Sequence, residues 1–233
     1  MSIKDLITQL DHNTNLMIRL DSYIESKEQR RPPDGFYHPS MAGNCSRAIW
    51  YYQTGVEAPP FSPVVMRKMD VGTALHVVMQ DYFDGMGELL AKEHVVKYTV
   101  KYPAPSITVS GSCDGILEKD GILEFKTAMS WSYQSMVKAG VPTSEHFAQW
   151  NLYSYGERIW EGIILIMNKD NQELWPFVVK FDKSIFNKTI EKFKLVHKHV
   201  KSGKPPDKPY KGMSDKACLY CDYKFVCWER KKK

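Results

Sequence analysis

No stretch of this 233-residue sequence holds the roughly 18 successive apolar residues that a membrane-spanning helix needs. The first residues carry acids and amides where a secretory signal would need an apolar core. Internal repeats and low-complexity segments are also missing, which excludes a repeat architecture. We therefore expect a cytoplasmic protein with no membrane partner, in the host cytoplasm if the chain is viral.

A strong excess of one charge is lacking as well. The net charge of +5 permits nucleic-acid binding without arguing for it. A hydrophobic content of 43% and a charged content of 25% are typical of a globular protein. The length fits one medium domain, or one domain with a small appendage.

The five cysteines should be reduced or bound to metal in an intracellular protein.

One stretch, CDGILEKDGILEFKTA from Cys113 to Ala128, places charged residues inside two apolar runs. The runs read as two strands joined by a turn at 119–121. Side chains alternate between the faces of a strand, so Glu124 and Lys126 share a face. Asp114 joins them if the loop has three residues, with Gly121 left-handed and Asp114 opposite Lys126, or if Gly115 forms a bulge. A two-residue loop would turn Asp114 to the other face.

Two carboxylates at one point repel each other unless a cation lies between them. Oxygen ligands suit Mg²⁺ or Mn²⁺, and a neighbouring lysine can orient or deprotonate a water or stabilise developing negative charge. These groups are the parts that hydrolyse a phosphodiester. The alternative is a surface hairpin with a cross-strand ion pair. The apolar neighbours favour a buried sheet, where unpaired charges are costly.

The remaining pattern alternates helices and strands, which predicts an α/β fold, a mixed β-sheet flanked by helices. Apolar residues recur at spacings of three and four from Ile3 to Ile24, as in a long amphipathic helix. We expect this helix to pack on the domain; the alternative is that it pairs with a protein partner or a second copy. We expect the following boundaries: a helix and linker over 1–39; helices over 63–89, 131–139, 143–160 and 184–200; and strands over 95–102, 107–117, 122–126, 162–167 and 175–180.

Other polar residues share helical faces. His76 lies four residues from both Gly72 and Gln80, and Gln149 lies four residues before Tyr153. His76 is a candidate metal ligand, Gln149 could hold a water or the lysine, and Tyr153 could lie against DNA. Each also has an ordinary structural interpretation, as a core histidine, a helix-surface amide and a packed aromatic.

The cysteines form a second pattern. Cys218 and Cys221 make a C-x₂-C pair, and Cys227 follows in CLYCDYKFVCWER. A fourth ligand could come from Cys45 or Cys113, and we favour Cys45 because Cys113 reads as a small buried strand residue. Thiolate sets of this kind hold zinc or an iron–sulfur cluster, and spacing alone does not separate them.

Together these pieces resemble the RecB-like PD-(D/E)xK nucleases of the iron–sulfur branch, which include the CRISPR-associated adaptation exonucleases and AddB. The resemblance spans Ser40 to Trp228. It rests on an ordered set of motifs: Cys45 before basic and aromatic residues, His76, Asp114-Gly115, Glu124-Phe125-Lys126, Gln149-x₃-Tyr153, and the closing cysteine triplet. The family's proline before the aspartate is absent, and Ser112-Cys113 stands there instead.

The resemblance implies a restriction-endonuclease-like nuclease domain over 40–233. His76, Asp114, Glu124 and the carbonyl of Phe125 would bind Mg²⁺ or Mn²⁺, with Lys126 as the catalytic lysine. Gln149 and Tyr153 would support the site. Cys45, Cys218, Cys221 and Cys227 would hold a 4Fe–4S cluster, with zinc as the alternative. The cluster would tie a lobe formed by residues 212–228 back to Cys45.

The sequence thus predicts a metal-dependent DNA nuclease, an exonuclease acting on single-stranded DNA or DNA ends. Recombination, repair, and phage or mobile-element DNA metabolism are the settings that the resemblance implies. The rival prediction is a DNA-binding iron–sulfur subunit of a recombination or repair complex that cuts nothing. The intact Asp114, Glu124, Lys126 and Gln149 argue against that rival.

Overall fold

The computed structural model describes residues 3–28 and 30–228, apart from the side chains of residues 5–13. The three lysines that end the sequence, Lys231 to Lys233, lie outside the described residues. The helices are α1 (Ile3–Glu25), η1 (Pro39–Met41), α2 (Ser46–Gln53), α3 (Pro63–Gly85), α4 (Ser130–Ala139), α5 (Ser144–Glu157), α6 (Lys183–Ser202), α7 (Lys216–Leu219) and α8 (Lys224–Trp228). The strands are β1 (Leu89–Val100), β2 (Ile107–Leu117), β3 (Gly121–Ala128), β4 (Glu161–Asn168) and β5 (Leu174–Lys180).

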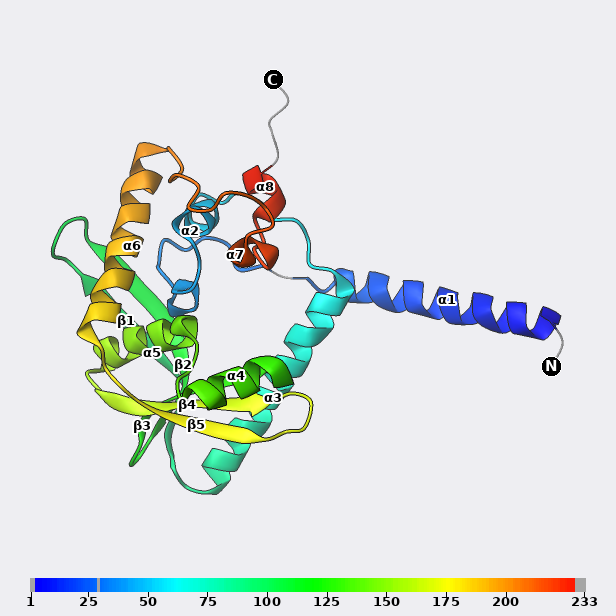
Figure 1. Cartoon of the computed structure of the whole chain (residues 1–233), viewed down its shortest axis with the longest axis horizontal. Helices are drawn as coiled ribbons and strands as arrows, with labels where there is room; N and C mark the ends of the chain where they lie inside the picture. Colours follow the sequence, from blue (N-terminus) through cyan, green and yellow to red (C-terminus); the bar gives the residue numbers. More distant parts are fainter. Residues whose placement is uncertain (1–2, 29, 229–233) are drawn as a thin grey trace.

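One five-stranded sheet organises the fold, with its strands in the order β1-β2-β3-β4-β5. Strands β3 and β4 run parallel, whereas the other neighbours are antiparallel. The parallel pair needs a crossover, and α4 and α5 provide it (Figure 1). The sheet is therefore mixed and flanked by helices, as the sequence predicts.

The two faces of β3 belong to different layers. Ile122 packs with Trp150 of α5 and Tyr133 of α4 in one apolar cluster. Leu123 and Phe125 pack with residues of α3 in another. Because successive side chains of a strand point to opposite faces, this alternation places α5 on one side of β3 and α3 on the other. None of the helices in the described part of the chain has the length and apolar character to cross a bilayer.

Local signals in the sequence set the ends of the helices around the site. Ser62 caps α3 ahead of Pro63, and Thr143 caps α5 by accepting from the backbone N–H of His146 at 3.2 Å. Gly140 follows α4 with φ of 69°, the left-handed conformation that ends many helices.

The hairpin of β2 and β3 has a different register from the one expected. Leu117 pairs with Gly121, Ile116 with Ile122, and Gly115 with Leu123. Gly121 is left-handed as predicted, with φ of 75°, but the turn comprises residues 118–120. The expected pairing of Asp114 with Lys126 is therefore wrong by two residues. A shift of two preserves the face of each side chain, so Asp114 still comes to Glu124.

Strand β1 begins at Leu89, six residues before the expected start. A register shift between Leu89 and Ala91 interrupts its pairing with β2, and Glu93 has a positive φ of 48°. These irregularities break the alternation of apolar and polar residues, which is the signal that a sequence gives for a strand.

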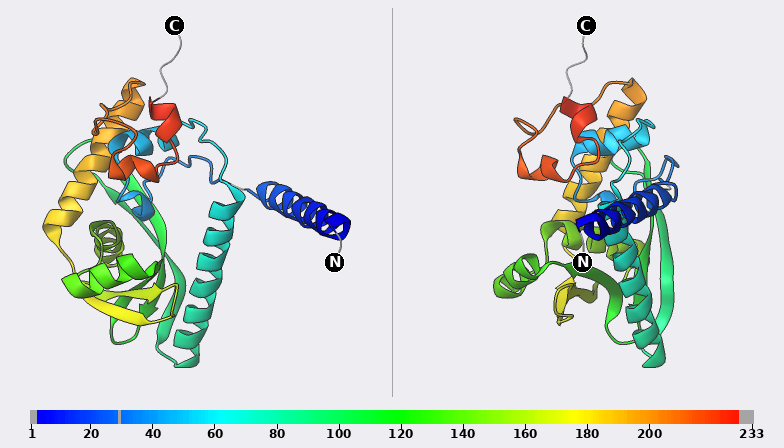
Figure 2. Two further views of the ribbon diagram at one scale, coloured as in Figure 1. Left: turned by 45° about the vertical axis from the view of Figure 1, so that its right-hand side comes forward. Right: turned by 90° about the vertical axis from the view of Figure 1, so that its right-hand side faces the viewer.

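Helix α1 leaves the body near the start of α3 and projects away from it (Figures 1 and 2). At its C-terminal end, Asp21 Oδ1 binds Arg67 Nη1 at 2.5 Å. The expectation that this helix packs along the domain is therefore wrong for most of its length.

Candidate active site

The predicted site residues come together at the point where β2 and β3 separate, between α3 and α5. We call His76, Asp114, Glu124, Lys126 and Gln149 the hairpin site. Its two carboxylates are buried, with Asp114 8% and Glu124 2% exposed. Acids are rarely buried unless they are paired, so the contacts of these two residues decide what the site can do.

Asp114 fills the gap that opens between β2 and β3 after the ladder ends at Gly115. Its Oδ2 accepts from the backbone N–H of Phe125 at 2.6 Å, and its Oδ1 lies 3.0 Å from His76 Nδ1. The ring of His76 stands edge-on to the ring of Phe125, with centroids 4.9 Å apart. The Asp114 carboxylate and the Phe125 ring together fix the position of His76.

Glu124 occupies the centre of the site. Its Oε1 lies 2.6 Å from Lys126 Nζ and accepts from Gln149 Nε2, also at 2.6 Å. Burial raises the pKa of the Glu124 carboxyl to about 7, although Lys126 opposes that shift. Its Oε2 is buried without a hydrogen-bond partner among the described residues. A buried carboxylate oxygen without a partner costs free energy, and such sites often serve a function.

Lys126 follows Glu124 on the same face of β3. Burial lowers the pKa of the Lys126 ammonium, but Glu124 and Asp114 outweigh burial, so the pKa is raised overall. Lys126 is therefore an ammonium at neutral pH, close to two carboxylates.

Helix α5 supplies the polar residues above β3. Gln149 Nε2 also lies 3.4 Å from the hydroxyl of Tyr153, one turn further along the helix. Tyr153 is buried in the core with Cys113 and Trp150. This position favours support of Gln149 over contact with a DNA strand.

His146 borders the hairpin site, and the sequence reasoning missed it. It lies three residues before Gln149 and shares its face of α5. Burial, and next the charge of Lys126, lower the pKa of His146 to about 4. Its Nδ1 is buried and lacks a hydrogen-bond partner within the described structure. The i, i+3 spacing to Gln149 was the available signal.

Gln80 connects the hairpin site to the edge strand. Its Nε2 donates to the backbone carbonyl of Asp114 at 3.0 Å and to Glu93 Oε1 at 2.6 Å. Glu93 Oε2 accepts from the Ser112 hydroxyl at 3.2 Å. Gln80 thus fixes the backbone of Asp114 from the same face of α3 that presents His76.

The four predicted cysteine ligands line one cavity at the other end of the molecule. We call Cys45 with residues 212–228 the cysteine lobe. Its cavity is bordered by the four cysteines and by Tyr51, Tyr210 and Trp228, among other residues. Burial raises the pKa of the Cys221 thiol, although a hydrogen bond with the backbone of Tyr223 opposes that shift. Cys113 is instead buried in the sheet core, as expected.

Contacts between distant segments hold the cysteine lobe against α2. Arg47 Nη1 donates to the carbonyl of Pro206 at 2.6 Å, and the ring centroids of Tyr51 and Tyr223 lie 5.3 Å apart.

In the arrangement of the structure, no three His, Cys, Asp or Glu side chains within residues 3–28 and 30–228 form a group that could hold a metal ion. In the hairpin site, the carboxylate and imidazole groups bond to each other or to Lys126, Gln149 and the backbone.

No family model and no curated protein sequence matches this chain. Solved structures do match. An alkaline exonuclease, LHK-Exo from Laribacter hongkongensis, has a TM-score of 0.54 over 72% of this chain and 89% of that chain, at 14% identity. The chain therefore shares the fold of that exonuclease. A protein described as SSO0001 has a TM-score of 0.60 over 91% of this chain and 95% of that chain, also at 14% identity. This mixed α/β fold is consistent with a restriction-endonuclease-like architecture.

Proposed function

We propose that this protein is a metal-dependent DNA nuclease of the RecB-like PD-(D/E)xK type, an exonuclease acting on single strands or DNA ends. One observation carries the proposal: Glu124 is buried with one oxygen bound to Lys126 and Gln149 and the other without a partner. A structural ion pair has no need of a buried, unsatisfied oxygen. The fold that the chain shares with an alkaline exonuclease supports the same conclusion.

The donor set fits a divalent cation. Asp114, Glu124 and the Phe125 carbonyl supply oxygen, His76 supplies nitrogen, and the unpartnered Oε2 of Glu124 gives a first ligand. Binding would require His76 and Asp114 to exchange their mutual hydrogen bond for the cation. When bound, Mg²⁺ or Mn²⁺ supplies a Lewis acid that polarises the scissile phosphate and a water molecule.

The chain's own residues supply positioning and charge. The Lys126 ammonium lies where it can donate to a phosphate oxygen and stabilise the negative charge of the transition state. Gln149 holds Glu124 in place and can accept a hydrogen bond from the attacking water through its amide oxygen. The hydroxyl of Tyr153 accepts from the Gln149 amide and holds that side chain in place. Gln80 donates to the backbone carbonyl of Asp114 and so holds β2 in place. In-line attack at the phosphorus then breaks the phosphodiester bond.

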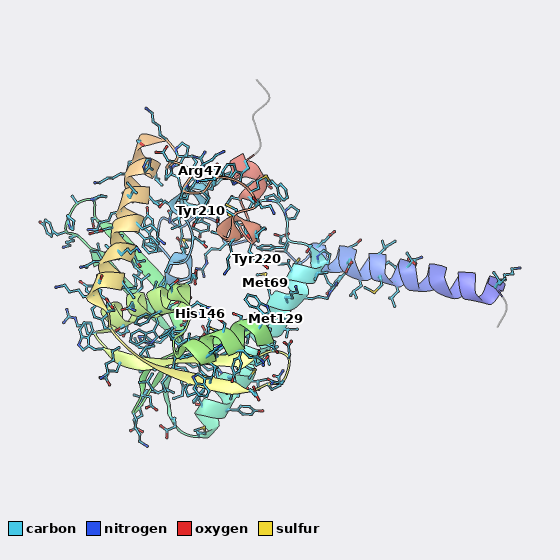
Figure 3. All side chains as sticks on the ribbon, viewed as in Figure 1. Arg47, Met69, Met129, His146, Tyr210 and Tyr220 are labelled. Atoms are coloured by element: carbon cyan, nitrogen blue, oxygen red, sulfur yellow. The ribbon has the colours of Figure 1, made fainter. Side chains whose placement is uncertain are left out.

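Exposed apolar side chains favour a single-stranded substrate. Met69, Met129 and Tyr220, together with His146, border the space between α3, α4, α5 and the cysteine lobe in the view of Figure 3. Met69, Met129 and Tyr220 are exposed, and so is Trp131 at the start of α4. Aromatic side chains can stack on the bases of a single strand. In a duplex the bases are paired and stacked inside the helix, where these side chains cannot reach them.

We further propose that Cys45, Cys218, Cys221 and Cys227 hold a 4Fe–4S cluster with a structural role. Four thiols around one cavity are the donor set that such a cluster uses, and their separation in the sequence would let it join the C-terminal segment to α2. Zinc is the alternative. Iron and zinc analysis of anaerobically purified protein separates the two, and a brown colour is expected only with iron–sulfur.

Degradation of single-stranded DNA labelled at either end tests the proposed function. The native protein should shorten the labelled strand with Mn²⁺, and the chelator-treated protein and Lys126→Ala should not. Lys180→Ala, which removes an exposed lysine paired with Glu161, is the matched control and should cleave normally. Folded native protein that binds DNA but cleaves no linear, nicked or circular form would favour the non-catalytic, DNA-binding role in recombination or repair.

A further inference from the structure

Two helices of this chain, α1 and α3, have 23 residues each, and the described part of each presents exposed apolar side chains. On α1 the stripe has the three- and four-residue spacing of helices that pack along one another. Met17 is 48% exposed and Leu20 is 42% exposed within it. Helix α1 points away from the body (Figure 2), and a helix gains most of its stability from packing an apolar face.

The stripe on α3 lies on the side away from the hairpin site. Val64, Val71 and Val78 follow one another at seven-residue intervals, and all three are 42–55% exposed. His76 and Gln80, which serve the site, lie on the opposite face of the same helix. The catalytic face of α3 is thus occupied, while its outer face presents valines to solvent.

The root of α1 is fixed in a way that keeps the two stripes of one chain apart. Asp21 binds Arg67, and the backbone N–H of Phe61 donates to Glu28 Oε2 at 3.1 Å. The Arg30 guanidinium lies 3.7 Å above the ring of Phe61. These contacts hold the segment after α1 against the start of α3 while α1 points outward.

We propose that two copies of the chain exchange these surfaces, so that α1 of each copy lies along the outer face of α3 of the other. Both stripes repeat every seven residues: Ile24 and Met17 on α1, Val64 and Val71 on α3. Charge favours the antiparallel arrangement. Glu25 ends α1, whose last turn has no basic residue, and Lys68 lies in the second turn of α3; neither belongs to the Asp21–Arg67 pair within one chain.

The exchange is reciprocal, so it closes on a two-fold axis and produces a dimer rather than a filament. A helix of this length extends about 34 Å, and two such contacts cover roughly 1,400 Å², within the range of stable interfaces. The proposal does not depend on the nuclease function.

The molar mass of the full chain in solution, measured by light scattering and sedimentation over a concentration series, tests the proposal. The native protein should be a dimer. Met17→Glu and Val71→Lys should each weaken dimerisation by about 100-fold, because each places a charge in both contacts. Val178→Lys, at an exposed valine on β5, is the control and should remain dimeric.

Mixing the two weakened variants gives the sharpest result. The heterodimer contains one unaltered contact and one contact in which the introduced glutamate faces the introduced lysine, so dimers should reappear on mixing. A native monomer at all concentrations would overturn the proposal. So would a dimer that Met17→Glu disrupts and Val71→Lys leaves intact, because that pattern means that two α1 helices pair with each other.

Discussion

The hairpin site and the cysteine lobe are built in opposite ways. The hairpin site lies on regular elements, and its side chains bond to each other: Lys126 and Gln149 to Glu124, His76 to Asp114. The cysteine lobe consists of short helices and turns, and its thiols face a common cavity. The first region has its geometry fixed by β3 and α5. The second brings together residues from the two ends of the sequence.

If the proposed metals are bound, this difference predicts a separate role for each of them. A buried sheet strand holds Glu124 and Lys126 in place whether or not a cation is present, so metal there would supply chemistry. The cysteine lobe contains helices of four and five residues, too short to be stable alone, so a metal cluster there would supply stability. Changes in one region should therefore affect activity, and changes in the other should affect folding.

The largest expected effect is on catalysis. Glu124→Gln should lower the DNA cleavage rate by about 10³-fold, because it removes the central carboxylate while keeping its shape. The iron content and the visible spectrum should be the same as in the native protein. Glu161→Gln, at an exposed acid, is the control for charge and should cleave normally. Loss of iron in Glu124→Gln would show that the two regions are not independent.

The cysteine lobe should show the reverse pattern. Cys221→Ser should prevent binding of the proposed cluster and destabilise the lobe by a few kcal/mol, because a thiolate-bound group that joins distant segments contributes its binding free energy to folding. Iron analysis and limited proteolysis within residues 212–228 measure these effects. Cys113→Ala removes the cysteine of the sheet core and should retain iron. Equal iron loss in both variants would contradict the assignment of Cys45 as the fourth ligand.

The free energy of unfolding of the chelator-treated protein, measured at several pH values, tests the burial of Glu124 and His146. The Glu124 pKa rises from 4.5 to about 7 on folding, so the folded state binds more protons and stability falls as pH rises through that window. The His146 pKa falls from 6.5 to about 4, so its contribution to stability rises with pH between those values. Each effect is about 3 kcal/mol at most, and the two oppose each other.

Substitution separates the two contributions. Glu124→Gln should leave a stability that increases with pH from about 4 to 6.5, and His146→Asn should leave one that decreases from about 4.5 to 7. Urea titrations at half-unit pH steps measure both. If neither substitution changes the pH dependence, the burial of these groups does not persist in solution.

The residues of both regions were largely predictable from the sequence, whereas their exact placement was not. Alternation along a strand puts Glu124 and Lys126 on one face whatever the partner strand does. The register with Asp114 depends on whether Leu117 pairs with Gly121, which is set by the length and type of the turn. The face was therefore predicted correctly and the pairing was wrong.

Tertiary context explains the other differences. The direction of α1 depends on contacts of Asp21 and Glu28 with α3 and Phe61, which are distant in the sequence. His146 escaped notice because the helix was interpreted through Gln149 and Tyr153. Its burial beside Lys126 follows from how α5 crosses β3, and local spacing does not encode that.

The smallest expected effect on catalysis is at His146, the hairpin-site neighbour that makes no bond to the two carboxylates in the described structure. His146→Asn should lower kcat by about 10-fold with little change in KM, because the imidazole lies beside Lys126 and can orient the groups around it without holding the substrate. Steady-state cleavage of a short single-stranded substrate measures both constants. His199→Asn, at the end of α6, is the control. A rise in KM at unchanged kcat would instead assign His146 to substrate binding, and the hairpin site would then extend along α5 toward the cysteine lobe.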